Sequence, residues 1–340
     1  MESRPLIAVT TGDPAGVGPE VVVKALANPQ VFATTRPLVL GDCDVLEQAK
    51  RWCNLSLDIR PVSRPDAGRY APGGFDLLDV GAIDAGSLRV GQAQAAAGKA
   101  AYEYLRRAID LALTGEVEAI ATAPINKEAL RLAGVPYLDH TEILAALTGS
   151  HNPLTMFVVR NLRIFFLTRH VSLATACQQI TRPRVLDGLI QVNAALRRFG
   201  ITNARIAVAA LNPHGGERGL FGEEETREIA PGIRDAREKG IDAYGPIPAD
   251  SVFHLALQGQ FDAVLSLYHD QGHVAAKTLD FERTISITTG LPFVRSSVDH
   301  GTAFNIAGQG VASSVSMEEA IRAAGEYARW LRAHSKGRSD

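Results

Sequence analysis

The chain alternates between short runs of apolar, often β-branched residues and longer amphipathic stretches. The short runs predict strands and the amphipathic stretches predict helices, two of which end at Gly115 and Gly200, as helices often do. Such alternation is typical of βαβ units, in which helices connect the parallel strands of a sheet. We therefore predict an α/β fold with mainly parallel sheets. The predicted strands span residues 6–11, 36–42, 117–123, 162–168, 205–211 and 262–268, and the predicted helices span residues 19–27, 95–115, 182–200 and 223–240.

The length and the charge of the chain limit what it can do. It has 340 residues, 46% of them hydrophobic and 21% charged. At roughly 150 residues per domain, we expect two domains whose cores need neither disulfides nor a structural metal. The 35 Lys and Arg residues nearly balance the 37 Asp and Glu residues, for a net charge of −2. This balance excludes nonspecific attraction to nucleic acid or an anionic membrane, so we expect a small molecule as the partner.

The cysteines and the first residues indicate a cytoplasmic protein. Cys43, Cys53 and Cys177 are odd in number and form no CxxC pair, which fits neither a disulfide framework nor a thiolate zinc site. The sequence MESRPLIAVTTGD enters a predicted strand without the apolar segment of a signal peptide. No apolar run approaches the ~18 residues that a spanning helix needs. We expect a protein of the reducing cytoplasm that does not enter a membrane.

Three predicted strands are each followed by a histidine: RIFFLTRH ends at His170, RIAVAALNPH at His214 and DAVLSLYH at His269. Open α/β sheets bind ligands beyond the carboxyl ends of their strands, so these histidines can converge on one crevice. Three imidazoles with open coordination positions suit Zn²⁺ or another divalent ion that also binds substrate. Alternatively, each histidine only caps its strand or forms a local hydrogen bond. The wide spacing excludes an HExxH motif, so a shared site requires tertiary or intersubunit contact.

A glycine-rich turn, TTGDPAGVGPE at residues 10–20, lies between a predicted strand and a predicted helix. Pro19 stands at the favoured first position of the helix, and such a turn can offer backbone N–H groups to an anion. The glycines follow the pattern GxxxGxG, so the GxGxxG dinucleotide fingerprint is absent. A tight turn without a ligand explains the same residues.

Three polar segments contain candidate anion ligands: LDHTE (138–142), YHDQGH (268–273) with Lys277, and GLPFVRSSVDHGTAFNIAG (290–308). Lys277 and Arg295 can bind a phosphate or carboxylate, Lys as a point charge and Arg through a bidentate fork, unless both are solvated surface cations. His140 and Thr141 add donors, although Thr141 can also be the N-cap of a helix over EILAAL.

Three further residues are candidates for proton transfer or substrate binding. Asp250 follows two prolines in GPIPAD and is either a base or substrate anchor, or the N-cap of a helix over SVFHLAL. His273 and His300 are candidates for proton transfer, although single histidines carry little information.

Taken together, these motifs resemble the 4-hydroxythreonine-4-phosphate dehydrogenase family of vitamin B6 biosynthesis. The resemblance covers nearly the whole chain and keeps the motifs in order. DHGTAFNIAG also resembles the HGSAPDIAG segment that lies against the adenosine part of NAD in isopropylmalate and isocitrate dehydrogenases, which implies their two-domain α/β/α fold and accounts for the missing fingerprint. The motifs are TTGDPAGVGPE, ATAPINKEAL (121–130), DHTEIL, LNPHGGERGLFGEEE (211–225), GPIPAD, YHDQGH and GLPFVRSSVDHGTAFNIAG (290–308).

The resemblance implies a homodimeric enzyme that uses NAD or NADP and one divalent ion, Zn, Mg or Co. It would oxidise the 3-hydroxyl of 4-phosphooxy-L-threonine, and the resulting β-keto acid would lose CO₂ to give 3-amino-2-oxopropyl phosphate. A cation on the substrate hydroxyl stabilises the alkoxide from which hydride leaves, and then the enolate formed as CO₂ departs. The protein then has to hold the reacting carbon against the nicotinamide and exclude water.

The resemblance also assigns residues to roles. It places the metal ligands on His170, His214 and His269, in a site assembled from both subunits. We further expect a terminal domain over residues 1–125 and 290–340 that carries much of the dinucleotide site, and a central domain over residues 126–289 with the metal ligands and the dimer interface. The expected substrate contacts are His140, Thr141, Lys277, Ser286 and Arg295, the catalytic candidates are Asp250 and Lys277, and the cofactor contacts are Gly290, Pro292, Asp299, His300, Gly301 and Asn305.

Two departures from the family pattern bear on the substrate. The chain has Ser286 in ISIT where the family generally has Asn in VNIT, and Asp139 in DHTE where it has Gly in GHTE. A shorter side chain and an added carboxylate indicate a changed substrate. The alternatives are D-threonate or D-erythronate 4-phosphate and a cis-dihydrodiol carboxylate. Outside this chemistry, three histidines can activate water in a metal-dependent hydrolase, and the fold can also serve as a metabolite-binding protein without catalysis.

Overall fold

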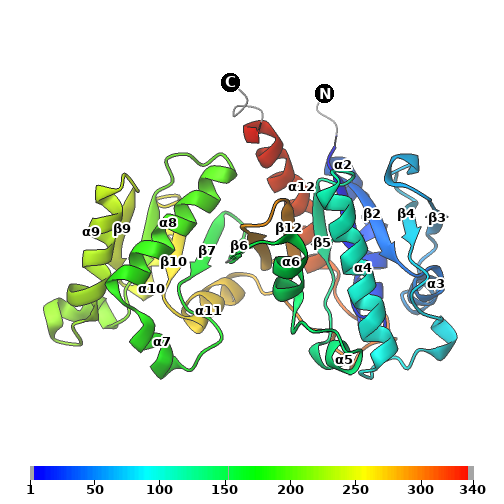
Figure 1. The fold of residues 1–340 in the computed structure, drawn as a ribbon, viewed down its shortest axis with the longest axis horizontal. Helices are drawn as coiled ribbons and strands as arrows, with labels where there is room; N and C mark the ends of the chain where they lie inside the picture. Colours follow the sequence, from blue (N-terminus) through cyan, green and yellow to red (C-terminus); the bar gives the residue numbers. More distant parts are fainter. Residues whose placement is uncertain (1–3, 152, 336–340) are drawn as a thin grey trace. The chain divides into compact units, whose positions relative to one another are not determined.

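The computed structural model describes residues 4–151 and 153–335. Contacts divide the chain into two compact units: unit 1 is Met1–Pro153 with Ile285–Arg329, and unit 2 is Leu154–Thr284 with Trp330–Asp340. Both units are layered from strands and helices (Figure 1). The expected boundary near residue 125 differs from this division, because the helices that follow it pack on the N-terminal part of the chain: Ala129 comes so close to Gly98 that no side chain would fit there.

Unit 1 contains a sheet with the strand order β3-β4-β2-β1-β5-β12-β11. Its strands pair in parallel except for β11 and β12, which are antiparallel. The strands are β1 (Leu6–Thr10), β2 (Arg36–Gly41), β3 (Asp58–Pro61), β4 (Gly74–Asp79), β5 (Ala119–Thr122), β11 (Ile285–Thr289) and β12 (Val294–Val298).

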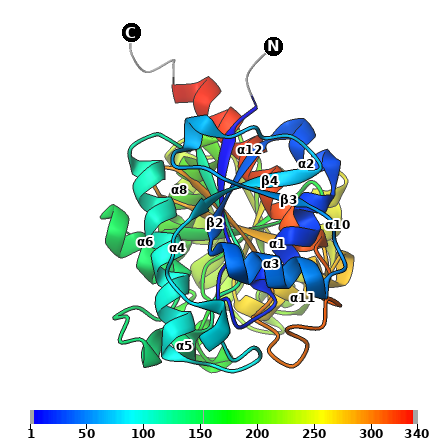
Figure 2. The same cartoon turned by 90° about the vertical axis from the view of Figure 1, so that its right-hand side faces the viewer.

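Helices cover both faces of this sheet, with α4 on one side of β2 and α1 on the other (Figure 2). The long helix α12 starts in unit 1, and its residues from Trp330 onward belong to unit 2. The helices with residues in unit 1 are α1 (Gly18–Ala27), α2 (Pro29–Thr34), α3 (Cys43–Trp52), α4 (Ala95–Leu113), α5 (Lys127–Leu132), α6 (His140–Thr148) and α12 (Val315–Ser335), with short 3-10 turns at Pro65–Ala67 and Ala85–Ser87.

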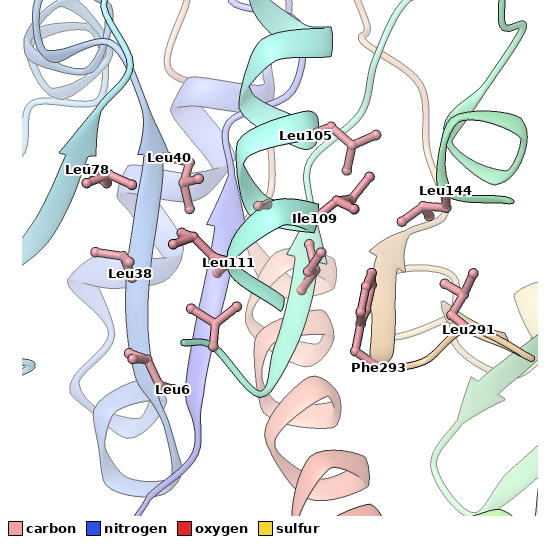
Figure 3. Packing of buried hydrophobic residues seen from close by; sticks show 14 of the residues in the cluster. Leu6, Leu38, Leu40, Leu78, Leu105, Ile109, Leu111, Leu144, Leu291 and Phe293 are labelled. Atoms are coloured by element: carbon pink, nitrogen blue, oxygen red, sulfur yellow. The ribbon is translucent and has the colours of Figure 1, made fainter. Parts of the chain in front are cut away.

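One hydrophobic core of unit 1 forms between the sheet and α4 (Figure 3). Leu6 and Ala8 of β1 point to this core because alternate residues of a strand share a face. On α4, Leu105 and Ile109 are one helical turn apart and meet the same surface. The amphipathic pattern of residues 95–115 therefore corresponds to a helix that is buried along one stripe.

Unit 2 contains a smaller sheet with the order β6-β7-β10-β8-β9, in which only β6 and β7 pair antiparallel. The strands are β6 (Leu154–Val159), β7 (Leu162–Phe166), β8 (Ile206–Ala209), β9 (Ala243–Ile247) and β10 (Ala263–Ser266). The helices are α7 (Leu173–Gln179), α8 (Arg182–Arg198), α9 (Ala230–Glu238), α10 (Ala249–Leu257) and α11 (His269–Leu279), with a turn segment at Pro213–Gly219 and a π-helical segment at Glu225–Ile229.

The predicted fold class is confirmed, and every predicted strand and helix is present. Gly115 and Gly200 follow α4 and α8 with φ values of +76° and +85°, as predicted for helix ends. The sequence did not reveal the less apolar strands, such as the largely exposed β3 and the proline-containing β9. Within residues 4–151 and 153–335, no helix combines the length and apolar character needed to cross a membrane.

Candidate functional site

The three predicted metal ligands follow three neighbouring strands of unit 2. β10 lies between β7 and β8 and pairs in parallel with both, so their carboxyl ends share one edge of the sheet. His170 follows β7, His214 follows β8 and His269 is the first residue of α11, directly after β10. The sequence argument that placed all three at strand ends is therefore consistent with the sheet order.

Two of these histidines lie close to each other. The ring centroids of His170 and His269 are 6.0 Å apart. Both residues line a cavity of about 400 Å³, together with Tyr268 and Asp270. The Nδ1 atom of His269 is 2.6 Å from Oδ1 of Asp270, a contact that leaves Nε2 as the nitrogen available to a ligand. A carboxylate on the second ring nitrogen is common for metal-binding histidines.

His214 is not gathered into the same cluster within one chain. Its side chain is 67% exposed, and its Nδ1 is 3.1 Å from Oε1 of Glu217. No group of three His, Cys, Asp or Glu side chains in the part of the chain that the structure describes is arranged to hold a metal ion. One chain therefore brings together two of the three predicted ligands, and the third faces outward.

Arg295 forms the centre of a polar cluster in unit 1. It lies on β12 and is only 5% exposed. Its Nε and Nη2 donate to Oγ1 of Thr122 at 3.1 and 2.7 Å, and its Nη1 donates to Oγ1 of Thr288 at 3.1 Å. Burial lowers the pKa of the guanidinium to about 10, so it stays charged at neutral pH, while Asp139 acts in the opposite direction. A buried cation held by hydroxyl groups is suited to receive an anion.

His140 begins α6 and lies in the electrostatic field of Arg295. Burial and the charge of Arg295 hold the pKa of the imidazole well below its usual range, so the ring is neutral. Its Nε2 atom is buried and has no hydrogen-bond partner among the described residues. The proposed N-cap role of Thr141 is wrong, because Asp139 caps α6: its Oδ1 accepts from the backbone N–H groups of Thr141 and Glu142.

Ser286 shares the polar face of β11 with Thr288. It is buried and lies opposite Ser297 of β12, just as Thr288 lies opposite Arg295. Residues two apart on a strand point to the same side, so Ser286 faces the side on which Thr288 binds Arg295. The structure thus groups three of the predicted substrate contacts, His140, Ser286 and Arg295, around one buried charge.

The predicted cofactor residues divide between opposite ends of β12. Asp299, His300 and Gly301 follow the carboxyl end of β12, whereas Gly290 and Pro292 lie in the turn before its first residue. The reason is the antiparallel pairing of β11 and β12, which the sequence pattern did not reveal. The structure therefore does not bring Gly290 and Pro292 together with the other predicted contacts, among them the exposed Asn305.

The glycine-rich turn after β1 packs against the segment that follows β12. The N–H of Val17 donates to the carbonyl of Thr302, and a Cβ atom on Gly16 would lie 2.8 Å from Thr302. The N–H of Ala15 donates to the carboxylate of Asp13. Because these N–H groups are already bonded within the protein, the structure favours the tight-turn interpretation over an anion site.

Sequence reasoning missed Glu20 of α1, whose carboxylate is fully buried. Its two oxygens accept from the backbone N–H groups of Gly308 and Gly310 at 2.6 Å each. Lys24, one turn further, donates to the carbonyl of Gly310. The chain after the predicted cofactor segment is therefore fixed by α1. The glutamate directly after Pro19 was the only sequence signal for this role.

The two predicted catalytic residues, Asp250 and Lys277, both belong to unit 2. Asp250 lies in the first turn of α10, where Pro248 takes the capping position, so the alternative N-cap role of Asp250 is wrong. Its Oδ1 accepts from Oγ of Ser251. Lys277 lies in the last turn of α11, with Nζ 5.3 Å from the ring centroid of Phe281.

Comparisons with known proteins agree with these observations. The family model described as pyridoxal phosphate biosynthetic protein PdxA matches residues 33–324. A protein of Symbiobacterium thermophilum that carries the provisional name D-threonate 4-phosphate dehydrogenase is 58% identical over 332 residues, 98% of this chain and 99% of that protein. A 4-hydroxythreonine-4-phosphate dehydrogenase structure from Burkholderia phymatum is 45% identical, with a TM-score of 0.84, over 96% of this chain and 99% of that chain.

A second solved structure, 4-hydroxythreonine-4-phosphate dehydrogenase from Klebsiella pneumoniae, is 42% identical with a TM-score of 0.89, over 96% of this chain and 98% of that chain. The predicted family and the predicted class of enzyme are thereby confirmed. The chain belongs to the family of the pyridoxal phosphate biosynthetic protein PdxA and is an oxidoreductase.

Proposed function

We propose that the protein oxidises the 3-hydroxyl of D-threonate 4-phosphate, or of a closely similar four-carbon acid phosphate, and that the β-keto product then loses CO₂. The buried Arg295 beside a neutral His140 carries this proposal, because it supplies a fixed cation and a neutral donor for a substrate anion. The expectation from the sequence put 4-phosphooxy-L-threonine first. The 58% identity to the Symbiobacterium thermophilum protein exceeds the 45% identity to the Burkholderia phymatum enzyme. This difference favours D-threonate 4-phosphate as the substrate.

Ser286 supports the same substrate. The family generally has Asn at position 286, whose amide donates and accepts hydrogen bonds through two separate atoms. The Ser side chain is shorter and offers a single hydroxyl, so it reaches less far. Threonate carries a hydroxyl where hydroxythreonine carries an amine, so the two substrates need different partners near carbon 2. We propose that Ser286, on the Arg295 side of β11, is one residue that sets this preference.

The donor set of unit 2 fits a divalent ion. Two imidazoles with ring centroids 6.0 Å apart can both direct a nitrogen at one cation, and imidazole ligands suit Zn²⁺ or Co²⁺. We propose that His170 and His269 hold such an ion together with His214. When bound, a divalent ion supplies a Lewis acid and NAD or NADP supplies the hydride acceptor. The residues of the chain orient the substrate: Arg295 and His140 bind its anion, and we retain Lys277 and Asp250 as candidates for moving the proton.

A second copy of the chain would account for the outward position of His214. The turn that carries His214 also exposes Leu220 and Phe221, which are 72% and 48% exposed. Exposed apolar side chains beside an exposed ligand residue are expected where another chain packs. We therefore propose a homodimer in which the histidines of the metal site come from both chains, and a cytoplasmic location remains a prediction.

A substrate panel tests this proposal. The purified protein is mixed with Co²⁺ or Zn²⁺, with NAD⁺ or NADP⁺, and with D-threonate 4-phosphate, D-erythronate 4-phosphate, 4-hydroxythreonine 4-phosphate or a cis-dihydrodiol carboxylate. We expect reduced cofactor and CO₂ in equal amounts, the highest kcat/KM with D-threonate 4-phosphate, and loss of turnover on chelation. If 4-hydroxythreonine 4-phosphate is the only compound that is turned over, the proposed substrate is wrong. If the protein instead hydrolyses a substrate in a metal-dependent reaction without reducing the cofactor, the proposed oxidation is wrong.

Two variants of one residue sharpen the test of specificity. Ser286→Asn should raise kcat/KM for 4-hydroxythreonine 4-phosphate relative to D-threonate 4-phosphate. Ser286→Ala is the matched control, since it removes the hydroxyl without adding an amide. If neither variant changes the ratio, Ser286 does not set the preference. If both variants change it equally, loss of the hydroxyl is responsible and the amide has no effect of its own.

A further inference from the structure

The turn that carries His214 has an unusual backbone. Five successive residues, from His214 to Arg218, have positive φ, including His214 at 52°, Glu217 at 46° and Arg218 at 59°. Residues with a Cβ rarely adopt this region, and a run of them persists only where surrounding contacts enforce it. Something outside the turn must therefore hold it in place.

A buried carboxylate supplies the contacts. Glu225 is 3% exposed and begins the π-helical segment Glu225–Ile229. Its Oε1 accepts from the backbone N–H groups of Leu211 and Asn212 at 2.8 and 2.7 Å, and its Oε2 accepts from Nδ2 of Asn212 at 2.8 Å. These bonds fix the chain two to three residues before His214.

The turn also closes over this carboxylate from the other side. A Cβ atom on Gly216 would lie 2.7 Å from Oε2 of Glu225, so only glycine allows the backbone this close. The buried carboxylate therefore touches the chain both before and after His214. π-Helical segments of this kind are frequent at functional sites.

A second buried side chain fixes the same point of the chain. Gln271, in the first turn of α11, donates through Nε2 to the carbonyl of Ala210 and accepts through Oε1 from the N–H of Leu267, both at 2.8 Å. It thus ties the end of β8, which leads to His214, to the end of β10, which leads to His269. Three successive residues after β8 are held by buried polar side chains from two different elements.

We propose that Glu225 is a positioning residue: it does not touch substrate or metal, but it holds the left-handed turn so that His214 is presented as a metal ligand. This inference rests on the proposed function, since it takes His214 to be a ligand. Partners of this indirect kind commonly change metal affinity by about 10- to 100-fold when they are removed.

The test compares Glu225→Gln with Glu224→Gln in the full chain. Gln at position 225 keeps the size but sets an amide N–H₂ against a donor, Nδ2 of Asn212. Glu224 is the matched control, because it contacts the same Nδ2 at 2.7 Å yet bonds none of the backbone N–H groups of Leu211 and Asn212. Each metal-free protein is titrated with Co²⁺ against a chromophoric chelator, and the visible spectrum of bound Co²⁺ is recorded.

We expect Glu225→Gln to weaken Co²⁺ binding by about 10- to 100-fold and to change the spectrum, and Glu224→Gln to stay within about twofold of the wild type. Wild-type affinity and spectrum in a folded Glu225→Gln protein would overturn the proposal. If that variant does not fold, Asn212→Ala decides instead, with a loss of about tenfold expected because one hydrogen bond to the carboxylate disappears. Unchanged affinity in Asn212→Ala would overturn the proposal.

A separate measurement distinguishes failure of this inference from failure of the proposed function. If the wild type and His214→Ala bind Co²⁺ equally, His214 is not a ligand and the proposed metal site is wrong. Tryptic cleavage after the exposed Arg218 then reports on the turn alone. Faster cleavage in Glu225→Gln than in Glu224→Gln supports the role of Glu225 in holding the turn, and equal rates exclude it.

Discussion

Replacement of Asp13 by Asn should stabilise the protein at neutral pH and have much less effect in mild acid. Asp13 lies in the turn after β1 and is fully buried. Its Oδ1 accepts from the N–H of Ala15 at 2.8 Å, whereas Oδ2 has no hydrogen-bond partner among the described residues. Burial raises the pKa of this carboxyl from 3.8 to about 6, and the bond from Ala15 offsets only part of the rise.

The size and direction of the effect follow from this pKa. Between pH 4 and 6 the folded protein keeps a proton on Asp13 that the unfolded chain has released, so stability falls as the pH rises through this range. A pKa rise from 3.8 to about 6 corresponds to about 3 kcal/mol of folding free energy. The wild type has lost this stability fully above about pH 7. Asn removes this loss and keeps an acceptor for Ala15, although it still buries an amide, which adds a constant cost at all pH values.

Urea denaturation of wild type and Asp13→Asn at several pH values between 4.5 and 7.5 measures the prediction. The free energy of unfolding of the variant, relative to wild type, should increase by about 2 kcal/mol between pH 4.5 and 7.5, because the wild type has already lost about 1 kcal/mol at pH 4.5. Asp44→Asn, at an exposed position of α3, is the matched control for removal of a carboxylate. A difference between Asp13→Asn and wild type that stays constant across this range would refute the reasoning, because the buried carboxyl would then not titrate with a raised pKa.

Three further predictions concern single contacts. Arg295→Ala should raise KM for the phosphorylated substrate by roughly 10- to 100-fold through loss of charge-assisted hydrogen bonds, and an unchanged KM would remove Arg295 from the site. Gly98→Ala should destabilise the protein by about 1 to 3 kcal/mol, because the added Cβ would lie 2.1 Å from the carbonyl oxygen of Ala129; an unchanged urea midpoint would contradict this packing. Tyr104→Phe should cost about 1 to 3 kcal/mol, measured in the same way, because the buried hydroxyl no longer donates to Asp42; full stability would mean that the bond contributes nothing.

Much of the fold could be predicted because burial leaves a periodic pattern in the sequence. β1, β2 and β10 are buried on both faces and appear as continuous apolar runs. The exposed strand β3 has no such run, and the antiparallel pairing of β11 and β12 depends on a short connection whose direction no periodicity reveals. The division of the predicted cofactor residues between the two ends of β12 follows from that single pairing.

The sequence by itself determined the family, the α/β class and the position of three histidines at the ends of strands, because these properties depend on local composition and on motifs that lie in order along the chain. Tertiary structure decided which of the candidates act together. It brought His140, Ser286 and Arg295 around one buried charge, put His170 beside His269, and left His214 on a turn held by Glu225. These relations join residues far apart in the sequence through strand order, register and burial. Such contacts form only when the sheets assemble, so no local pattern records them.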